Sequence, residues 1–200
     1  MVDYGAGNMV SIEQALTAVG ADVRIADTPA DLGRIDALVV PGVGAAKPAM
    51  ARLRGQGLVD SIQAWIASDR AFLGICLGLQ LLFEGSDEDG AVTLGALPGR
   101  TRRLRDAPTL PHIGWNQVTR TYPHAAFDGI EDGADFYFVH SYAGDLPEGH
   151  CDVVAHTTHG STFASAVSRG NLLGVQFHPE RSGADGLRLL GNFVDLVRAA

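Results

Sequence analysis

The chain has 200 residues, of which 46% are hydrophobic and 19% charged, so it can bury a core and is not a disordered chain. Its 23 Asp and Glu residues outnumber 15 Lys and Arg residues, and the net charge of −8 disfavours binding to nucleic acid or anionic membranes. The longest apolar stretch, residues 71–83, is too short to span a bilayer, and no export signal marks the start. We therefore expect one cytoplasmic domain covering residues 1–200.

The first half of the chain alternates between helical patterns and short apolar runs typical of buried strands. In chain order, the predicted elements are a helix at residues 8–19, strands at 22–25 and 36–40, a helix at 58–66, a strand at 71–75 and a helix at 77–83. Ser11 and Gln14 form a capping-box pattern in the first helix. This βαβαβα order favours a parallel sheet with helices on both faces and ligands beyond the carboxyl ends of the strands.

From Gly90 onward, short strand patterns are separated by turn residues. The predicted strands are at residues 136–139, 153–156, 163–167 and 172–177, and a helix follows Glu180. Short strands separated in this way are typical of antiparallel or mixed sheet. We therefore predict an α/β fold with an open, mostly parallel sheet flanked by helices and a mixed or antiparallel extension in the second half.

The segment Gly74-Ile-Cys76-Leu-Gly78 has the pattern of a nucleophile elbow with cysteine in place of serine. Glycines two places on either side allow a sharp strand-to-helix turn without a Cβ clash. A thiol at this turn faces a helix N-terminus that favours the thiolate, and the Leu77 N–H can bind an oxyanion. A free cysteine is more often a small buried hydrophobic residue. The elbow pattern nevertheless favours Cys76 as a nucleophile.

A nucleophilic thiol needs a base, and His178-Pro179-Glu180 directly follows the apolar run 172–177. Residues two apart in extended backbone face the same way, and Pro179 holds His178 in the extended region. His178 and Glu180 can therefore act as a base and its orienting carboxylate, whereas the alternative is a solvated strand end. None of the other six histidines combines a carboxylate two residues later with a preceding apolar strand, although His140 is a candidate for substrate contact.

Two glycine-rich turns have different interpretations. Pro41-Gly-Val-Gly44 follows a predicted strand at the ligand-binding edge, and its glycines let backbone N–H groups approach an oxyanion. Gly5-Ala-Gly7-Asn-Met-Val10 resembles the start of a dinucleotide fingerprint, but Val10 replaces the third glycine, so an ordinary turn is favoured. The charged stretches 84–89 and 100–105 are expected to be solvated surface. Cys151 lacks an elbow or a base and is interpreted as a free structural thiol.

These motifs together resemble the glutamine amidotransferase subunits of imidazole glycerol phosphate synthases, which act in histidine biosynthesis. The matching segments cover nearly the whole chain and are residues 3–8, 41–44, 74–84, 111–116, 137–142 and 174–180. The Gly-x-Cys-x-Gly-x-Gln and His-Pro-Glu segments are similar to triad-type glutamine amidotransferases in general. Pro-Gly-Val-Gly and Pro-His-Ile-Gly-Trp-Asn are similar to this subunit in particular.

The resemblance implies a reaction and the residues that perform it. Cys76 attacks the side-chain amide of glutamine, His178 passes a proton to the departing ammonia, and Glu180 orients His178. Glutamate leaves after the thioester is hydrolysed, and the amides of Val43 and Leu77 act as oxyanion donors. The glutamine pocket is implied to contain Gly42, Gly44, Gln80, Glu88, His140, Ser141 and Tyr142. No metal or other cofactor is implied.

The resemblance also implies a partner. In the family, ammonia passes through a (β/α)₈-barrel cyclase subunit to a ribulosyl nucleotide, giving imidazole glycerol phosphate and an aminoimidazole carboxamide ribonucleotide. A sealed path is needed because ammonia that is protonated in water loses its nucleophilicity. We expect a heterodimer in which the oxyanion loop, residues 41–44, does not adopt its catalytic conformation without the cyclase. The positions that match the family's barrel-facing residues are Asn8, Trp115, Asn116 and Arg181.

The chain departs from the family's pattern in three places. Only Met1 and Val2 stand before Asp3, where the family has several apolar residues of a first strand, so either the start is trimmed or misassigned or the central strand is short. Residues 45–48 lack the usual aromatic residue and glycine, and Arg181 stands where lysine is usual. Three other functions fit part of the pattern. A glutaminase of another pathway is disfavoured by the segment around Trp115, a stand-alone thiol hydrolase would need no partner, and a non-catalytic binding module is disfavoured by the intact triad.

Overall fold

The computed structural model describes residues 1–146, 150 and 152–199 of the chain. Cys151, which the sequence analysis interprets as a free structural thiol, lies outside the described residues. The strands are β1 (Ala37–Val40), β2 (Ala71–Ile75), β3 (Gly85–Ser86), β4 (Arg100–Arg103), β5 (His112–Arg120), β6 (Ala134–His140), β7 (Tyr142–Gly144), β8 (Val153–His159), β9 (Ser161–Arg169) and β10 (Leu172–Val175). The α-helices are α1 (Met9–Ala18), α2 (Ala46–Gly55), α3 (Leu58–Ala67), α4 (Leu77–Gln80) and α5 (Gly183–Ala199). Short 3₁₀ helices are found at Pro29–Arg34, Ala125–Phe127 and Pro179–Arg181.

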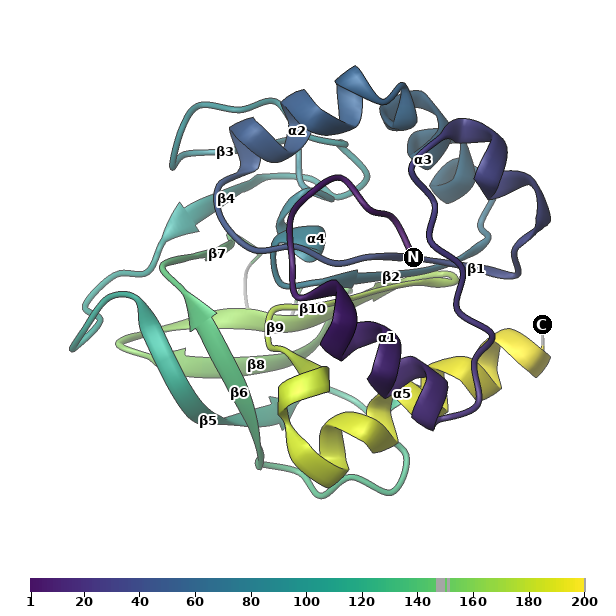
Figure 1. Cartoon of the computed structure of the whole chain (residues 1–200). Coiled ribbons are helices and arrows are strands. Elements are labelled where there is room, and N and C mark those ends of the chain that lie inside the picture. Colours follow the sequence, from purple (N-terminus) through teal and green to yellow (C-terminus); the bar gives the residue numbers. More distant parts are fainter. Residues whose placement is uncertain (147–149, 151, 200) are drawn as a thin grey trace.

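A mixed sheet with the strand order β1-β2-β10-β9-β8-β5-β6 forms the centre of the molecule. Figure 1 shows α2 and α3 on one side of its β1–β2 part and α1 and α5 on the other. Successive side chains of a strand point to opposite faces. Leu38 therefore packs in the same cluster as Met50 of α2, whereas Val39 packs in the same cluster as Leu16 of α1. The predicted α/β fold is confirmed.

The parallel and antiparallel parts of the sheet meet at β10. Strand β2 pairs in parallel with both β1 and β10, and antiparallel pairing continues from β10 through β9, β8 and β5 to β6. The predicted mixed extension is therefore confirmed. Because β10 lies beside β2, Val175 is next to Ile75. The residues that follow these two strands emerge at the same edge of the sheet, which brings the Cys76 and His178 segments together.

Three predicted elements differ from the structure. The first helix begins at Met9 with Asn8 as its N-cap, so the capping box at Ser11 and Gln14 is wrong because both residues lie inside the helix. The helix predicted at residues 77–83 ends at Gln80, since the N–H groups of Leu82 and Phe83 donate to carbonyls three residues back. The sequence patterns also did not reveal α2, β4, β5 or β7. No helix in the described part of the chain has the length and apolar character needed to cross a membrane.

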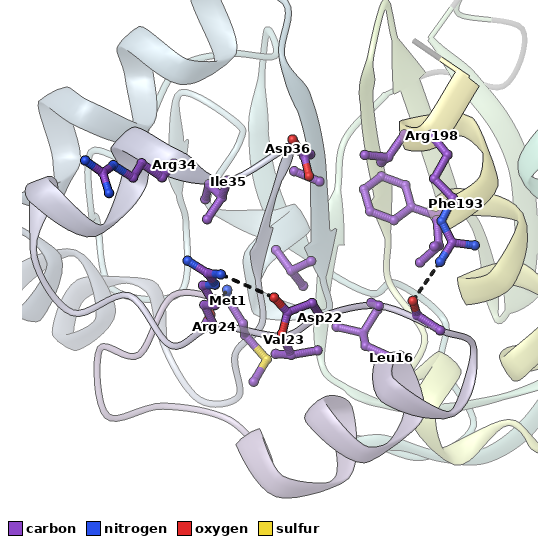
Figure 2. Close-up of a pocket in the computed structure, with 16 residues that line it drawn as sticks. Met1, Leu16, Asp22, Val23, Arg24, Arg34, Ile35, Asp36, Phe193 and Arg198 are labelled. Atoms are coloured by element: carbon purple, nitrogen blue, oxygen red, sulfur yellow. Dashed lines mark hydrogen bonds and ion pairs between the residues drawn. The ribbon is translucent and has the colours of Figure 1, made fainter.

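Residues 22–25 do not form the predicted strand. Pairing near this segment is limited to a single parallel bridge between Val2 and Ala26, and the Val2 N–H donates to the Val39 carbonyl at 2.9 Å. Beyond this bridge, a pocket separates residues 22–24 from Ile35 (Figure 2). A parallel ladder needs a hydrogen-bonded neighbour along its whole length, and residues 22–24 line this pocket instead.

Candidate active site

Cys76 occupies the sharp turn between β2 and α4. Its backbone has φ 52° and ψ −105°, a region that residues other than glycine rarely adopt. The Cys76 N–H donates to the Val175 carbonyl at 2.8 Å, which ties the turn to the end of β10. The strand-to-helix turn predicted from the sequence is therefore present, and it holds the buried thiol in one orientation at the end of the strand.

Close packing explains the two glycines around Cys76. A Cβ atom on Gly78 would lie 1.7 Å from the Val40 carbonyl oxygen, and a Cβ on Gly74 would lie 2.8 Å from the Gly78 backbone. Neither contact can be relieved by turning a side chain, because the atoms met belong to backbone. The absence of a side chain at both positions lets the first turn of α4 press against the ends of β1 and β2.

His178 and Glu180 form a buried pair at the end of β10. The His178 Nδ1 lies 2.8 Å from Glu180 Oε1, and both side chains are almost completely buried. Burial lowers the pKa of His178, but its interactions with Cys76 and Glu180 outweigh burial and raise the pKa to about 10. With Nδ1 donating to Glu180, the Nε2 atom is free of hydrogen bonds to the described residues. The imidazole can therefore hold a proton beside the thiol.

Gln176 is a polar residue at the thiol that the sequence analysis missed. It is fully buried, and its Nε2 donates to the Cys76 Sγ at 3.6 Å. Its Oε1 accepts a hydrogen bond from Gln80 Nε2 at 3.1 Å, and the same Gln80 nitrogen donates to the Tyr142 carbonyl at 2.7 Å. Its place two residues before His178 is the signal that could have identified it.

The loop that follows β1 contacts the elbow directly. The Tyr4 hydroxyl donates to the Pro41 carbonyl at 2.6 Å, and burial raises the pKa of Tyr4. The Leu77 N–H, predicted as an oxyanion donor, donates to the Gly42 carbonyl at 3.3 Å. Val43, the other predicted donor, has a side chain that is exposed. The glycine-rich turn before α1 thus has a structural use, since Tyr4 directly precedes it and supports the 41–44 loop.

The structure brings together only some of the residues predicted to form the glutamine pocket. Gln80 and Tyr142 are joined by a hydrogen bond and linked through Gln176 to the thiol, and Ser141 lies beside Tyr142 at the start of β7. Gly42 is buried and Gly44 is exposed, with φ +97°. Glu88 is exposed on the turn after β3, where its N–H donates to the Ser86 hydroxyl rather than to this group. Partial burial and Asp89 raise the pKa of Glu88.

His140 is buried, and both of its ring nitrogens have partners inside the protein. Nδ1 lies 2.9 Å from the Tyr142 carbonyl, and Nε2 lies 3.2 Å from His112 Nδ1. Burial lowers the pKa of His140 to about 3, so the ring is neutral. The His140 side chain thus holds the carbonyl of Tyr142, another residue of the predicted pocket, and its contact with substrate stays a prediction.

The residues predicted to face a partner fall into two groups. Trp115 is 57% exposed and packs edge-on against Tyr137, and the Arg181 guanidinium lies 4.0 Å from the centre of the Tyr137 ring. These three side chains form one exposed cluster. Asn116 points the other way, donating to the Thr158 carbonyl at 2.9 Å, and Asn8 is the N-cap of α1.

Comparison with known proteins establishes the family. Residues 1–196 match the family model of glutamine amidotransferase class-I. The chain is 46% identical over 202 residues to the imidazole glycerol phosphate synthase subunit HisH of Microcystis aeruginosa, with 99% of this chain and 95% of the relative covered. It is 47% identical over 201 residues to HisH of Moorella thermoacetica, with 100% of this chain and 95% of the relative covered. The chain belongs to the HisH family of class-I glutamine amidotransferases.

Solved structures show the same fold. The HisH-family chain is similar to a crystal structure of glutamine amidotransferase, with a TM-score of 0.78 and 20% identity, covering 98% of this chain and 97% of that one. It is also similar to PurLQS from Thermotoga maritima, with a TM-score of 0.73 and 18% identity, covering 98% and 96% of the two chains. At these identities the likeness concerns the fold alone.

Proposed function

We propose that this protein hydrolyses glutamine to glutamate and ammonia and delivers the ammonia to a cyclase subunit that makes imidazole glycerol phosphate and an aminoimidazole carboxamide ribonucleotide. The observation that carries the proposal is a buried thiol on a strained elbow beside an imidazole held by a buried carboxylate. The catalytic unit is one domain over residues 1–200 and acts in the cytoplasm.

The chemistry follows from the positions of three side chains. The Cys76 thiolate attacks the carbonyl carbon of the side-chain amide, forming a C–S bond and a tetrahedral oxyanion. The C–N bond then breaks as protonated His178 gives its proton to the leaving nitrogen, which departs as ammonia. Water then attacks the thioester carbon as His178 accepts a proton from the water, and the C–S bond breaks to release glutamate and the Cys76 thiolate. Glu180 holds the imidazole through Nδ1 so that Nε2 handles each proton.

The oxyanion loop gives the reaction a point of control. Stabilising the tetrahedral intermediate requires the Leu77 and Val43 N–H groups to point at its oxygen. In this structure the Leu77 N–H instead donates a hydrogen bond to the Gly42 carbonyl. Reversing the Gly42–Val43 peptide frees the Leu77 N–H and turns the Val43 N–H inward. Glutamine hydrolysis is therefore slow until cyclase binding favours the reversed peptide, which prevents ammonia from being released without an acceptor.

The exposed cluster of Trp115, Tyr137 and Arg181 is the proposed centre of the cyclase interface. Exposed aromatic and arginine side chains are enriched at the energetic centres of protein interfaces. Asn8 extends the interface to the start of α1, and the two subunits form a heterodimer. A closed interface keeps ammonia unprotonated on its way to the cyclase, and the complete two-subunit enzyme then acts as a lyase.

Glutamate release from glutamine tests the proposal. The protein is assayed alone, with a cyclase subunit, and with the cyclase and its nucleotide ligand. We expect low activity alone and strong stimulation by cyclase and nucleotide together. Cys76→Ala should lower glutamine-dependent synthesis by at least about 10³-fold, while synthesis from added ammonium salts continues. Equal, rapid hydrolysis without the cyclase would instead identify a stand-alone thiol hydrolase.

A further inference from the structure

A chain of hydrogen bonds runs from β5 to the predicted glutamine pocket. Asn116 Nδ2 lies 3.2 Å from His112 Nε2, and His112 Nδ1 lies 3.2 Å from His140 Nε2. His140 Nδ1 lies 2.9 Å from the Tyr142 carbonyl. His112 and His140 are directly opposite each other in the β5–β6 ladder, which places their rings side by side.

The direction of every hydrogen bond in this chain is determined by its two ends. The Tyr142 carbonyl can only accept, so His140 Nδ1 donates, and the neutral His140 ring must accept at Nε2. His112 therefore donates from Nδ1 and accepts at Nε2, where the Asn116 amide supplies the hydrogen. The other amide hydrogen of Asn116 goes to the Thr158 carbonyl, and its Oδ1 accepts from the Gln117 N–H.

The surroundings keep both rings neutral and in place. Burial lowers the pKa of His112 to about 4, and His140 is neutral for the same reason. The His112 ring is stacked between Phe138, at 4.8 Å between ring centres, and His159, at 4.0 Å. A ring held from both faces has little freedom to rotate, so His112 presents its Nδ1 hydrogen in a constant direction.

The Tyr142 carbonyl also decides how Gln80 is oriented. Gln80 Nε2 donates to the Tyr142 carbonyl and to Gln176 Oε1, so both of its hydrogens have acceptors. The amide nitrogen of Gln80 is thereby directed toward Tyr142 and Gln176, which fixes the plane of its amide group. If the Tyr142 carbonyl moved, Gln80 would lose this orientation.

We propose that His112 is a positioning residue for glutamine binding: its Nδ1 hydrogen orients His140, and through it the Tyr142 carbonyl that directs Gln80. This inference rests on the proposed glutaminase function. The His112 ring nitrogens contact His140 and Asn116 rather than the thiol. Removal of His112 should therefore raise the KM for glutamine much more than it lowers kcat, because Cys76, His178 and Glu180 keep their own contacts.

Three substitutions separate the hydrogen bond from the stacking. The side-chain amide nitrogen of Asn overlies the Nδ1 position of histidine, so His112→Asn keeps the donor to His140 but loses the stacked ring. His112→Phe keeps a stacked ring and loses the donor. His112→Gln places its amide near the Nε2 position and also loses the donor. His124→Phe is the matched control, because His124 bonds to Ser168 outside this chain of contacts.

Glutaminase kinetics with saturating cyclase and its nucleotide ligand, together with thermal unfolding of each variant, test the proposal. Loss of one buried hydrogen bond should raise KM about tenfold in His112→Phe and His112→Gln, with kcat within about threefold of wild type. We expect the KM of His112→Asn to lie within about threefold of the wild-type value, and the KM of His124→Phe to be unchanged.

Two results would overturn the inference. The first is a His112→Phe variant whose KM for glutamine equals that of the wild type. Because the unsubstituted protein is active in this case, the proposed function would still hold. The second is a KM that follows the unfolding temperature across the three variants, because this would show that His112 acts only through stability. An unsubstituted protein that fails to hydrolyse glutamine even with cyclase would refute the proposed function itself and this inference with it.

Discussion

The parallel and antiparallel parts of the central sheet contribute different things to the site. Around β1, β2 and β10, functional groups lie in the turns directly after the strands, as Cys76 and His178 do. Around β5 and β6, they lie opposite one another across a ladder, as His112 and His140 do. The first arrangement places the reacting groups by local backbone geometry. The second places supporting and surface groups by the register of strands.

This difference has a physical basis. A strand-to-helix turn is determined by a few consecutive residues, and the positive φ of Cys76 is an example. A cross-strand pair depends on which residues of two segments happen to face each other, which a one-residue shift would change completely. We therefore expect substitutions in the parallel part to affect chemistry and folding, and those in the antiparallel part to affect binding.

The largest effect is expected for Glu180→Gln in the parallel part. The amide keeps the shape of the side chain but removes the charge that holds protonated His178, so kcat for glutamine should fall by about 10²- to 10⁴-fold. Steady-state glutaminase assays with cyclase measure this effect, with ammonia-dependent synthesis as the control. An active Glu180→Gln variant would show that the carboxylate has no role in orienting the base.

The protonation of His178 provides a second test of the parallel part. Its pKa is raised from 6.5 to about 10 in the folded protein, so the charged ring stabilises the fold. This stabilisation is complete below about pH 6.5 and is lost as the pH rises through about 10. NMR titration should show no change at the His178 ring between pH 6 and 8, and titration nearer neutrality in Cys76→Ala. A wild-type His178 that titrates near pH 6.5 would contradict this expectation.

Trp115→Ala tests whether the antiparallel part provides the binding surface. Removal of an exposed aromatic side chain at the centre of an interface should weaken cyclase binding by about 2 kcal/mol or more, measured by calorimetry. The free energy of unfolding should change little, because the side chain is exposed. Val92→Ala, at another exposed apolar residue, is the control. Unchanged cyclase affinity in Trp115→Ala would show that the interface is centred elsewhere on the protein.

Gly78→Ala tests the packing of the elbow through stability. The new Cβ would overlap the Val40 carbonyl, so we expect a loss of about 1–3 kcal/mol in the free energy of unfolding, measured with denaturant. Gly55→Ala is the matched control, since it lies in α2 with open space around it and should be neutral or slightly stabilising. Equal stability of the two variants would show that α4 can shift away from β1.

The sequence patterns predicted the elements whose signals are local. The buried strand 71–75 and the helix 58–66 appear in the structure with nearly the same bounds. The strand predicted at residues 22–25 is absent, because strand formation also requires a partner along its length. Strand β5 was missed because it is held by pairing with distant strands, residues 112–118 with β6 and residues 119–120 with β8, which no single-segment pattern reveals.

The sequence by itself determined the nature of the reacting groups: the elbow around Cys76 and the His178-Pro-Glu180 segment can be identified from consecutive residues, and the family follows from the same motifs. Only the tertiary structure decided what lies between them. It placed Gln176 at the thiol, brought the His140 ring to the Tyr142 carbonyl, and directed the Leu77 N–H to the Gly42 carbonyl. These contacts join segments far apart in the chain, so they exist only when the sheet brings those segments together.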